Sequence, residues 1–252
     1  MRKLVSGIVA AMLLAALSGI ALADNPAGSA KGVNPAADAA AGGANRTLVV
    51  GSDVFIGDVV ETGPKGQVQI LFADDTELVV GPRSTLKIED YLLRNNGSAG
   101  KLAVDMLSGA FRFVTGDSAK NRYQIDTPTG TIGVRGTGFD VFVGADGATS
   151  ILLYHGAVQF CSLSKVCQVI SNYCDVGHYD HSDAQVLGDS RLSRGDLRNT
   201  LKGEFIYAMN QSPLLRQFWI ATAYDCLHNA PTVPPQPPRQ SDQPPPPKRV
   251  AS

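Results

Sequence analysis

The stretch YQIDTPTGTIGVRGTGFDVFV, residues 123–143, decides the fold class. Apolar and polar residues alternate with a period of two in residues 123–125 and again in residues 139–143, which is the pattern of β-strands that bury one face. A Thr-Pro pair and four glycines separate the two runs, and proline and glycine favour turns. The stretch therefore predicts β-strands joined by tight turns.

The same pattern extends on both sides, over residues 47–171. Short runs rich in β-branched residues occupy 68–72 and 78–80, and alternating runs occupy 86–89 and 111–114. Gly, Pro, Asn and Asp separate them at close intervals. Many short strands with such turns predict a mainly β fold, an antiparallel sandwich or roll. The alternation of strands and helices that produces a parallel sheet is not seen.

The first 23 residues have the features of a secretory signal peptide. Arg2 and Lys3 precede a long apolar run, and the run ends in a small-residue site at Ala23. We expect cleavage before Asp24; the alternative is an uncleaved anchor, since about 19 apolar residues just span a bilayer. Cleavage would place the protein in the periplasm or outside the cell, with no integral membrane segment.

All four cysteines follow the predicted cleavage site. An even number in an oxidising compartment predicts two disulfides, and four cysteines allow three pairings. We favour Cys161 with Cys167, because only five residues separate them between two strand-like runs. The remaining pair, Cys174 with Cys226, would tie the C-terminal region to the β-domain.

Composition divides the rest of the chain. Residues 24–45 are mostly Ala, Gly, Asn and Pro, so we expect a disordered leader there. The β-domain then covers 46–175, a helical C-terminal extension covers 176–230, and a proline-rich disordered tail covers 231–252. The tail is interpreted as a disordered end or as a docking segment or spacer.

Within the extension, apolar residues recur at helical spacing over 196–211. Ser212 and Pro213 resemble an N-cap and a first helical position. They predict a second helix that ends near Cys226, so we expect a small helical appendix packed against the β-domain.

Five short motifs occur in this order: GDVVETGP (57–64), ILFADDTEL (70–78), GPRSTL (81–86), YQIDTPTGTIGVRGTGF (123–139) and HGAV (155–158). In order and spacing they resemble the FecR domain family, over residues 49–168. Asp75 stands where that family usually has glycine, and aspartate tolerates the left-handed turn conformation better than most residues.

The resemblance implies a periplasmic β-domain for sensing, scaffolding or protein contact. The family's named member relays a signal from an outer-membrane iron-citrate receptor to a cytoplasmic sigma factor. That member has a cytoplasmic segment and a membrane span before its periplasmic domain, whereas here only Met1 to Lys3 precede the apolar run.

The glycine-rich signature also contains the candidate binding residues, Arg135, Gly136 and Thr137. An arginine side chain can bind a carboxylate through two parallel hydrogen bonds, and the glycines would let a ligand approach the backbone closely. The alternative is a structural turn in which Arg135 binds a buried carboxylate or carbonyls.

Other polar groups give weaker signals. The formal charge of -1 and the pI of about 6.4 provide no electrostatic reason to expect nucleic acid. The glycine spacing does not match a dinucleotide fingerprint, so no cofactor is expected. Asp74 and Asp75 fit a turn, and His155 has no evident acidic partner. One loop gathers possible metal ligands at a spacing that matches no zinc finger, so we expect no metal site. These are Cys174, Asp175, His178, Asp180, His181 and Asp183.

We therefore expect a noncatalytic, exported FecR-like protein, a module for sensing, signalling or protein interaction. An envelope protein or a cell-wall glycan would be its partner. One alternative is a hydrolase that acts on the envelope, which would need convergent polar groups in a cleft. Another is a structural envelope protein that uses the proline-rich tail as a spacer.

Overall fold

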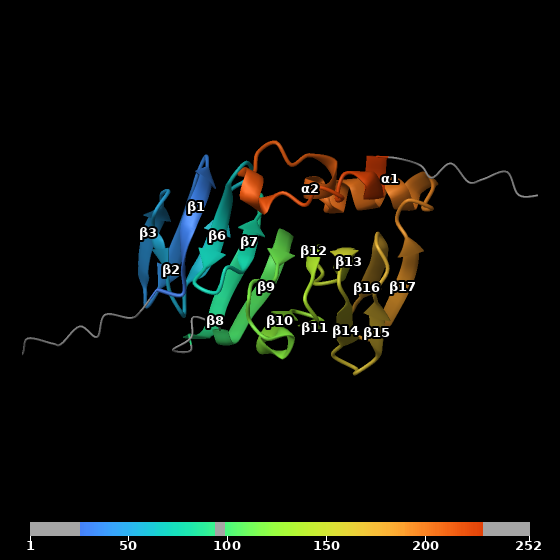
Figure 1. The fold of residues 1–252 in the computed structure, drawn as a ribbon, viewed down its shortest axis with the longest axis horizontal. Coiled ribbons are helices and arrows are strands. Elements are labelled where there is room, and N and C mark those ends of the chain that lie inside the picture. The colour runs from blue at the N-terminus through green and yellow to red at the C-terminus, as the bar shows by residue number, and fades with distance from the viewer. Residues whose placement is uncertain (1–25, 94–98, 229–252) are drawn as a thin grey trace, which may run out of the picture.

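The computed structural model describes residues 26–93 and 99–228 as a long β-sandwich with a few short helices (Figure 1). The strands are β1 Gly28–Asn34, β2 Ala37–Ala41, β3 Ala44–Leu48, β4 Asp53–Val54, β5 Val59–Thr62, β6 Gln67–Phe72, β7 Glu77–Val80, β8 Thr85–Leu93, β9 Ala99–Val114, β10 Tyr123–Thr127, β11 Gly130–Val134, β12 Gly138–Val143, β13 Thr149–His155, β14 Val158–Ser162, β15 Cys167–Ile170, β16 Asp175–Tyr179 and β17 Ala184–Asp189. The helices are α1 Gly195–Glu204, α2 Ile206–Met209 and α3 Asp225–His228, with 3₁₀ turns η1 Lys120–Arg122 and η2 Arg216–Phe218.

These strands form two layers that share β9. Sheet A has the order β4-β1-β6-β7-β9-β12-β13-β16-β17. Sheet B has the order β3-β2-β5-β8-β9-β10-β11-β14-β15. All pairings are antiparallel except that of β9 with β10. The chain passes from one sheet to the other while it advances along the long axis of the molecule (Figure 1). The predicted mainly β fold is confirmed.

Strand β9 changes layers at Gly109. Before this residue it pairs with β8 in sheet B, and from this residue onward it pairs with β12 in sheet A. Gly109 has a φ of 100°, and a Cβ there would lie 2.1 Å from Ser84 Oγ. A glycine is therefore required where the long strand bends, because any side chain would be strained and would collide.

The core lies between the two sheets, as the period-two alternation predicts. Ile125 and Ile132 enter it from sheet B, while Phe139 and Val141 enter it from sheet A. Each of these side chains is almost fully buried. Burial of such apolar side chains provides the main favourable free energy of this fold.

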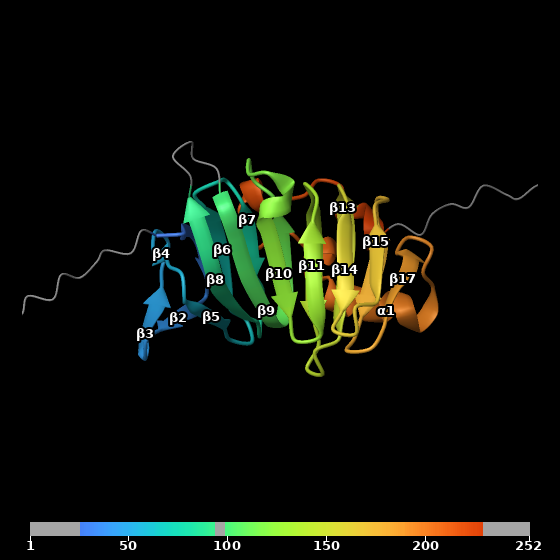
Figure 2. The same cartoon turned by 90° about the horizontal axis from the view of Figure 1, so that it is seen from below.

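The helical segment covers the outer face of sheet A. Leu201, Phe205 and Ala208 form an apolar cluster with Leu152 and Val176 of the sheet. Figure 2 looks onto the opposite side of the molecule, the outer face of sheet B, and the described helices lie behind the sandwich. In the residues that the structure describes, no helix is of the length and apolarity that crossing a bilayer requires.

The prediction of a disordered leader over 24–45 is wrong for its described part, because residues 28–34, 37–41 and 44–45 lie in strands. Strand β1 pairs with β6, and β2 pairs with β5. Small side chains are needed here: a Cβ at Gly28 would lie 2.5 Å from the carbonyl oxygen of Leu71. Hydrogen bonding to strands that follow in the sequence offsets the entropy of ordering this segment, which composition alone does not reveal.

The boundary expected at 176 is also wrong, because the sheet continues through β16 and β17, as far as Asp189. The helix predicted over 196–211 is interrupted at Phe205, whose φ of -97° and ψ of 65° are not helical. Ser212 does not begin a long helix; its backbone N–H donates to Asn210 Oδ1 at 2.9 Å. The chain beyond it forms the short elements η2 and α3, and it contacts the sheet where the N–H of Leu215 donates to Gln69 Oε1 at 2.7 Å.

Both favoured disulfides are present. Cys161 and Cys167 face each other across β14 and β15, and Cys174 is joined to Cys226 in α3. The predicted signal peptide at 1–23 and the proline-rich tail at 231–252 lie outside the described residues, and both remain predictions.

Candidate functional site

The predicted binding residues Arg135, Gly136 and Thr137 form the connection from β11 in sheet B to β12 in sheet A. Arg135 is exposed, and its backbone N–H donates to the carbonyl of Ala157 at 3.0 Å. Thr137 is buried, and its N–H donates to Thr115 Oγ1 at 3.0 Å. Gly136 has no side chain and that of Thr137 is buried, so only the side chain of Arg135 is available to a partner.

The glycines around this turn serve packing. Gly156 has a φ of 86°, and a Cβ there would lie 2.2 Å from the carbonyl oxygen of Gly136. A Cβ at Gly138 would lie 2.4 Å from Nε2 of His155. The turn at Gly156 can approach Gly136, and the ring of His155 can approach Gly138, because glycine has no side chain. The glycine pattern therefore has a structural explanation.

Beside Arg135 the surface has an open hollow of about 540 Å³. Gly133 and two residues with amide side chains, Asn121 and Gln159, are among the residues that line it. Gly133 pairs with both Gln124 and Gln159 on the neighbouring strands, and it has no side chain that would fill the hollow. The hollow thus combines a cation with neutral hydrogen-bonding groups.

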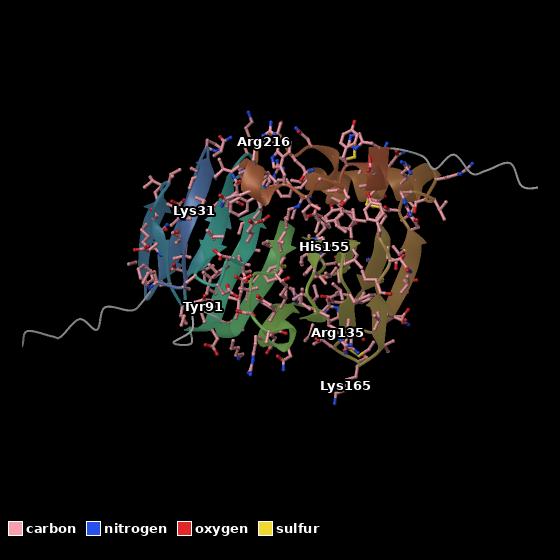
Figure 3. The ribbon with its side chains drawn as sticks, viewed as in Figure 1. Lys31, Tyr91, Arg135, His155, Lys165 and Arg216 are labelled. Atoms are coloured by element: carbon pink, nitrogen blue, oxygen red, sulfur yellow. A yellow bond between two sulfur atoms is a disulfide. The ribbon has the colours of Figure 1, made fainter. Side chains whose placement is uncertain are left out.

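The guanidinium of Arg135 forms no ion pair with any residue that the structure describes. Figure 3 shows it on the side of the sandwich away from the helices, whereas His155 lies on the helix side. A free, planar cation beside amide groups is suited to binding a carboxylate together with nearby polar atoms.

A second polar cluster joins helix α1 to sheet A. Ser150 Oγ lies 3.2 Å from His178 Nδ1. Burial raises the pKa of Glu204, while a hydrogen bond from Ser150 and the charge of His178 oppose that rise. Ser150 is only 3% exposed, and the carboxyl group contacts the serine instead of orienting the histidine. This is not the arrangement of a nucleophile, a base and an orienting acid.

Asp74 and Asp75 belong to a turn, and His155 packs over a glycine. Asp74 is buried and accepts hydrogen bonds from Ser118 Oγ at 2.6 Å and from Tyr123 OH at 3.1 Å. Asp75 adopts the left-handed φ of 61° that its place in the turn requires. His155 lies over Gly138, and burial lowers its pKa.

The loop of possible metal ligands is stabilised by other interactions. Cys174 is in a disulfide, and Asp175 Oδ2 accepts the N–H of Asn172 at 2.9 Å. Asp180 Oδ1 accepts the N–H groups of Ser182 at 2.7 Å and Asp183 at 2.9 Å. Among the described residues, no three His, Cys, Asp or Glu side chains are placed to hold a metal ion.

Sequence reasoning missed the cluster of Arg112, Asp140 and Tyr154 between sheet A and the helical segment. Tyr154 OH donates to Asp140 Oδ2 at 2.6 Å, and burial strongly raises the pKa of Tyr154. Alternation with Phe111 and Phe113 places Arg112 on the outer face of its sheet. From the alternation alone, Arg112 would be predicted to be exposed to solvent. In the structure the helical segment covers this face of the sheet and buries the side chain.

A two-layer β-sandwich with helices over one face is the architecture of the described chain. The family model described as "FecR protein" matches residues 58–159. These residues therefore form a FecR domain, and the predicted resemblance is confirmed. Strands β1–β4 precede this domain and β15–β17 follow it, so both sheets extend beyond it at each end.

Two crystal structures of a "putative anti-sigma factor" from Parabacteroides distasonis ATCC 8503 are also similar to this chain. Each matches at 12% sequence identity, with TM-scores of 0.42 and 0.41. The match covers 51% of this chain and 57% of that chain, which is less than two thirds of its length. No curated protein matches the sequence.

Proposed function

We propose that this protein is a noncatalytic, exported FecR-type module that senses or signals by binding an envelope protein through the surface around Arg135. The observation that carries this proposal is the unpaired guanidinium of Arg135 beside the amide-lined hollow. A carboxylate of the partner would bind the guanidinium, and polar groups of its main chain would bind the amides.

Two observations support export. Residues 1–23 have the pattern of a signal peptide, and all four cysteines form disulfides. Disulfides persist in oxidising compartments and are rare in the cytosol. In cell fractions, we expect the protein in the envelope or the medium, starting at Asp24 and resistant to thiol alkylation until reduced. Reactive thiols in the native protein would contradict export.

A noncatalytic role is supported by the organisation of the polar groups. In the cluster of Ser150, His178 and Glu204, the serine is buried and the carboxyl group contacts the serine instead of the histidine. Arg135, which lines the hollow, lies on the other side of the sandwich from His155 (Figure 3). A binding surface explains a free cation on this open face better than a hydrolytic site does.

The test places a photo-crosslinking amino acid at Gln159, which lines the hollow, and irradiates the producing cells. We expect a crosslinked species of discrete mass that is lost in Arg135→Ala and weakened in Arg135→Lys, because lysine keeps the charge but not the planar pair of donors. A crosslinker at Lys31, on the helix side of the molecule (Figure 3), is the control and should give no such species.

Two outcomes would overturn this proposal. One is a crosslink at Gln159 that Arg135→Ala does not change while the variant remains folded. The other is a heterogeneous product that glycan-degrading enzymes remove, because it would identify cell-wall glycan as the partner instead of a protein.

A further inference from the structure

A second hollow lies between the β-turns of the FecR domain and the helical segment. It has a volume of about 480 Å³, and Pro64, Pro82, Phe142 and Ile206 form apolar parts of its wall. Ligand sites of a few hundred Å³ are typically apolar with a few polar groups that fix orientation. This groove thus has the volume and the wall of a binding site.

Arg83 supplies the charge at this groove. Its side chain is exposed and forms no ion pair with any described residue. An apolar groove with one free cation matches a ligand that has an apolar body and one negative charge.

The backbone of Arg83 is a second and independent observation. Its φ is 53°, in the left-handed region, within the turn that joins β7 to β8. Glycine or asparagine adopts this conformation more easily than arginine does. Residues held in such conformations cluster at functional sites. The strained backbone of Arg83 therefore supports a functional role for its side chain at the groove.

Gly203 indicates which ligand fits. It lies in the last turn of α1 and lines the groove. Carbonyl groups in the last turn of a helix lack intrahelical partners. A peptide N–H can donate to such a carbonyl, whereas an acyl chain cannot.

We propose that this groove binds the C-terminal end of an apolar peptide, with the terminal carboxylate paired to Arg83. The apolar side chains of the peptide would contact Pro82, Phe142 and Ile206. The site shares no lining residue with the hollow at Arg135, so the two surfaces can be tested separately.

The test uses the protein purified from its producing cells and a fluorophore-labelled peptide, Leu-Val-Leu, as the free acid and as the C-terminal amide. Fluorescence polarisation should show saturable binding of the acid. The affinity for the amide should be lower by about tenfold or more, because the amide cannot form the charge-assisted pair with Arg83. Laurate, added as a competitor, should not displace the peptide.

Two variants test the groove. Arg83→Asn suits the left-handed turn, so it should keep or raise the midpoint of urea unfolding while it weakens binding of the acid about tenfold or more. In Gly203→Phe the new side chain should fill the groove and abolish binding, and the fold should tolerate it, because nothing lies within 4 Å of a Cβ at this position.

Lys165→Asn is the matched control, since it removes an exposed cation from another left-handed backbone position, with a φ of 63°, that lines neither hollow. It should leave peptide binding unchanged. Equal binding of acid and amide, displacement by laurate, no binding at all, or unaltered binding in Arg83→Asn would each overturn the proposal.

Discussion

Arg112 Nε donates to Asp140 Oδ1 at 2.7 Å, and Arg112 Nη2 donates to Asp140 Oδ2 at 3.0 Å. The side chains are 1% and 2% exposed, so this bidentate pair is enclosed between sheet A and the helical segment. Arg112 also donates to Gln211, and Gln211 accepts the N–H of Ile220 at 2.8 Å. The pair thereby connects the FecR domain to the helical segment that covers it.

Removal of one partner should be strongly destabilising. Arg112→Leu leaves Asp140 buried without its cation, and we expect a loss of about 3–5 kcal/mol in the free energy of unfolding. Urea denaturation gives the value. The double variant Arg112→Leu, Asp140→Leu should be more stable than the single variant, because no uncompensated charge remains. A double variant less stable than Arg112→Leu would contradict this account.

Glu77 should make stability depend on pH. Burial and the charge of Asp75 raise its pKa from 4.5 to about 7 in the folded protein. Because the folded value lies above the unfolded one, the fold favours the protonated form. This stabilisation is fully present below pH 4.5 and is lost as the pH rises through about 7.

Glu77→Gln should therefore be more stable than the wild type by about 1 kcal/mol at pH 8, after an allowance for solvent screening, and nearly equal to it at pH 4. Urea midpoints at the two pH values measure the effect. Asp75→Asn is the control and should lower the pKa of Glu77. A gain from Glu77→Gln that is the same at both pH values would refute titration as its cause.

The two disulfides should differ in their contributions. Cys174 and Cys226 are 52 residues apart, whereas Cys161 and Cys167 are 6 apart. In the loop-entropy model, opening the long loop costs about 4 kcal/mol and opening the short one about 2 kcal/mol. Paired Cys→Ser variants, unfolded in urea, test the order. A larger loss from the 161–167 pair would contradict it.

Strand β1 should be sensitive to a single added methyl group. Gly28→Ala would place Cβ 2.5 Å from the carbonyl oxygen of Leu71, which is part of the backbone and cannot move freely. We expect a loss of about 1–3 kcal/mol on urea unfolding. Gly63→Ala is the control, since nothing lies within 4 Å of its Cβ, and it should change stability little. A neutral Gly28→Ala would show that β1 does not contribute to the folded sheet.

Much of the FecR domain could be predicted because its signals are local. The inward residues Ile125, Ile132 and Phe139 follow from period-two alternation alone. The pairing of Cys161 with Cys167 follows from their short separation between two strands. For the candidate site, the sequence identified Arg135, but only the structure showed that Thr137 points into the interior.

The sequence by itself determined which residues alternate, where turns interrupt them and which motifs carry the FecR signature, because neighbouring residues set these features. The tertiary structure decided which outer surfaces are covered. Gln67 Nε2 donates to the carbonyl of Pro213, 146 residues away, and Arg112 donates to Gln211. Contacts of this kind hold the helical segment over Arg112. Local composition does not encode such contacts, since their free energy depends on surfaces that meet only after the chain has folded.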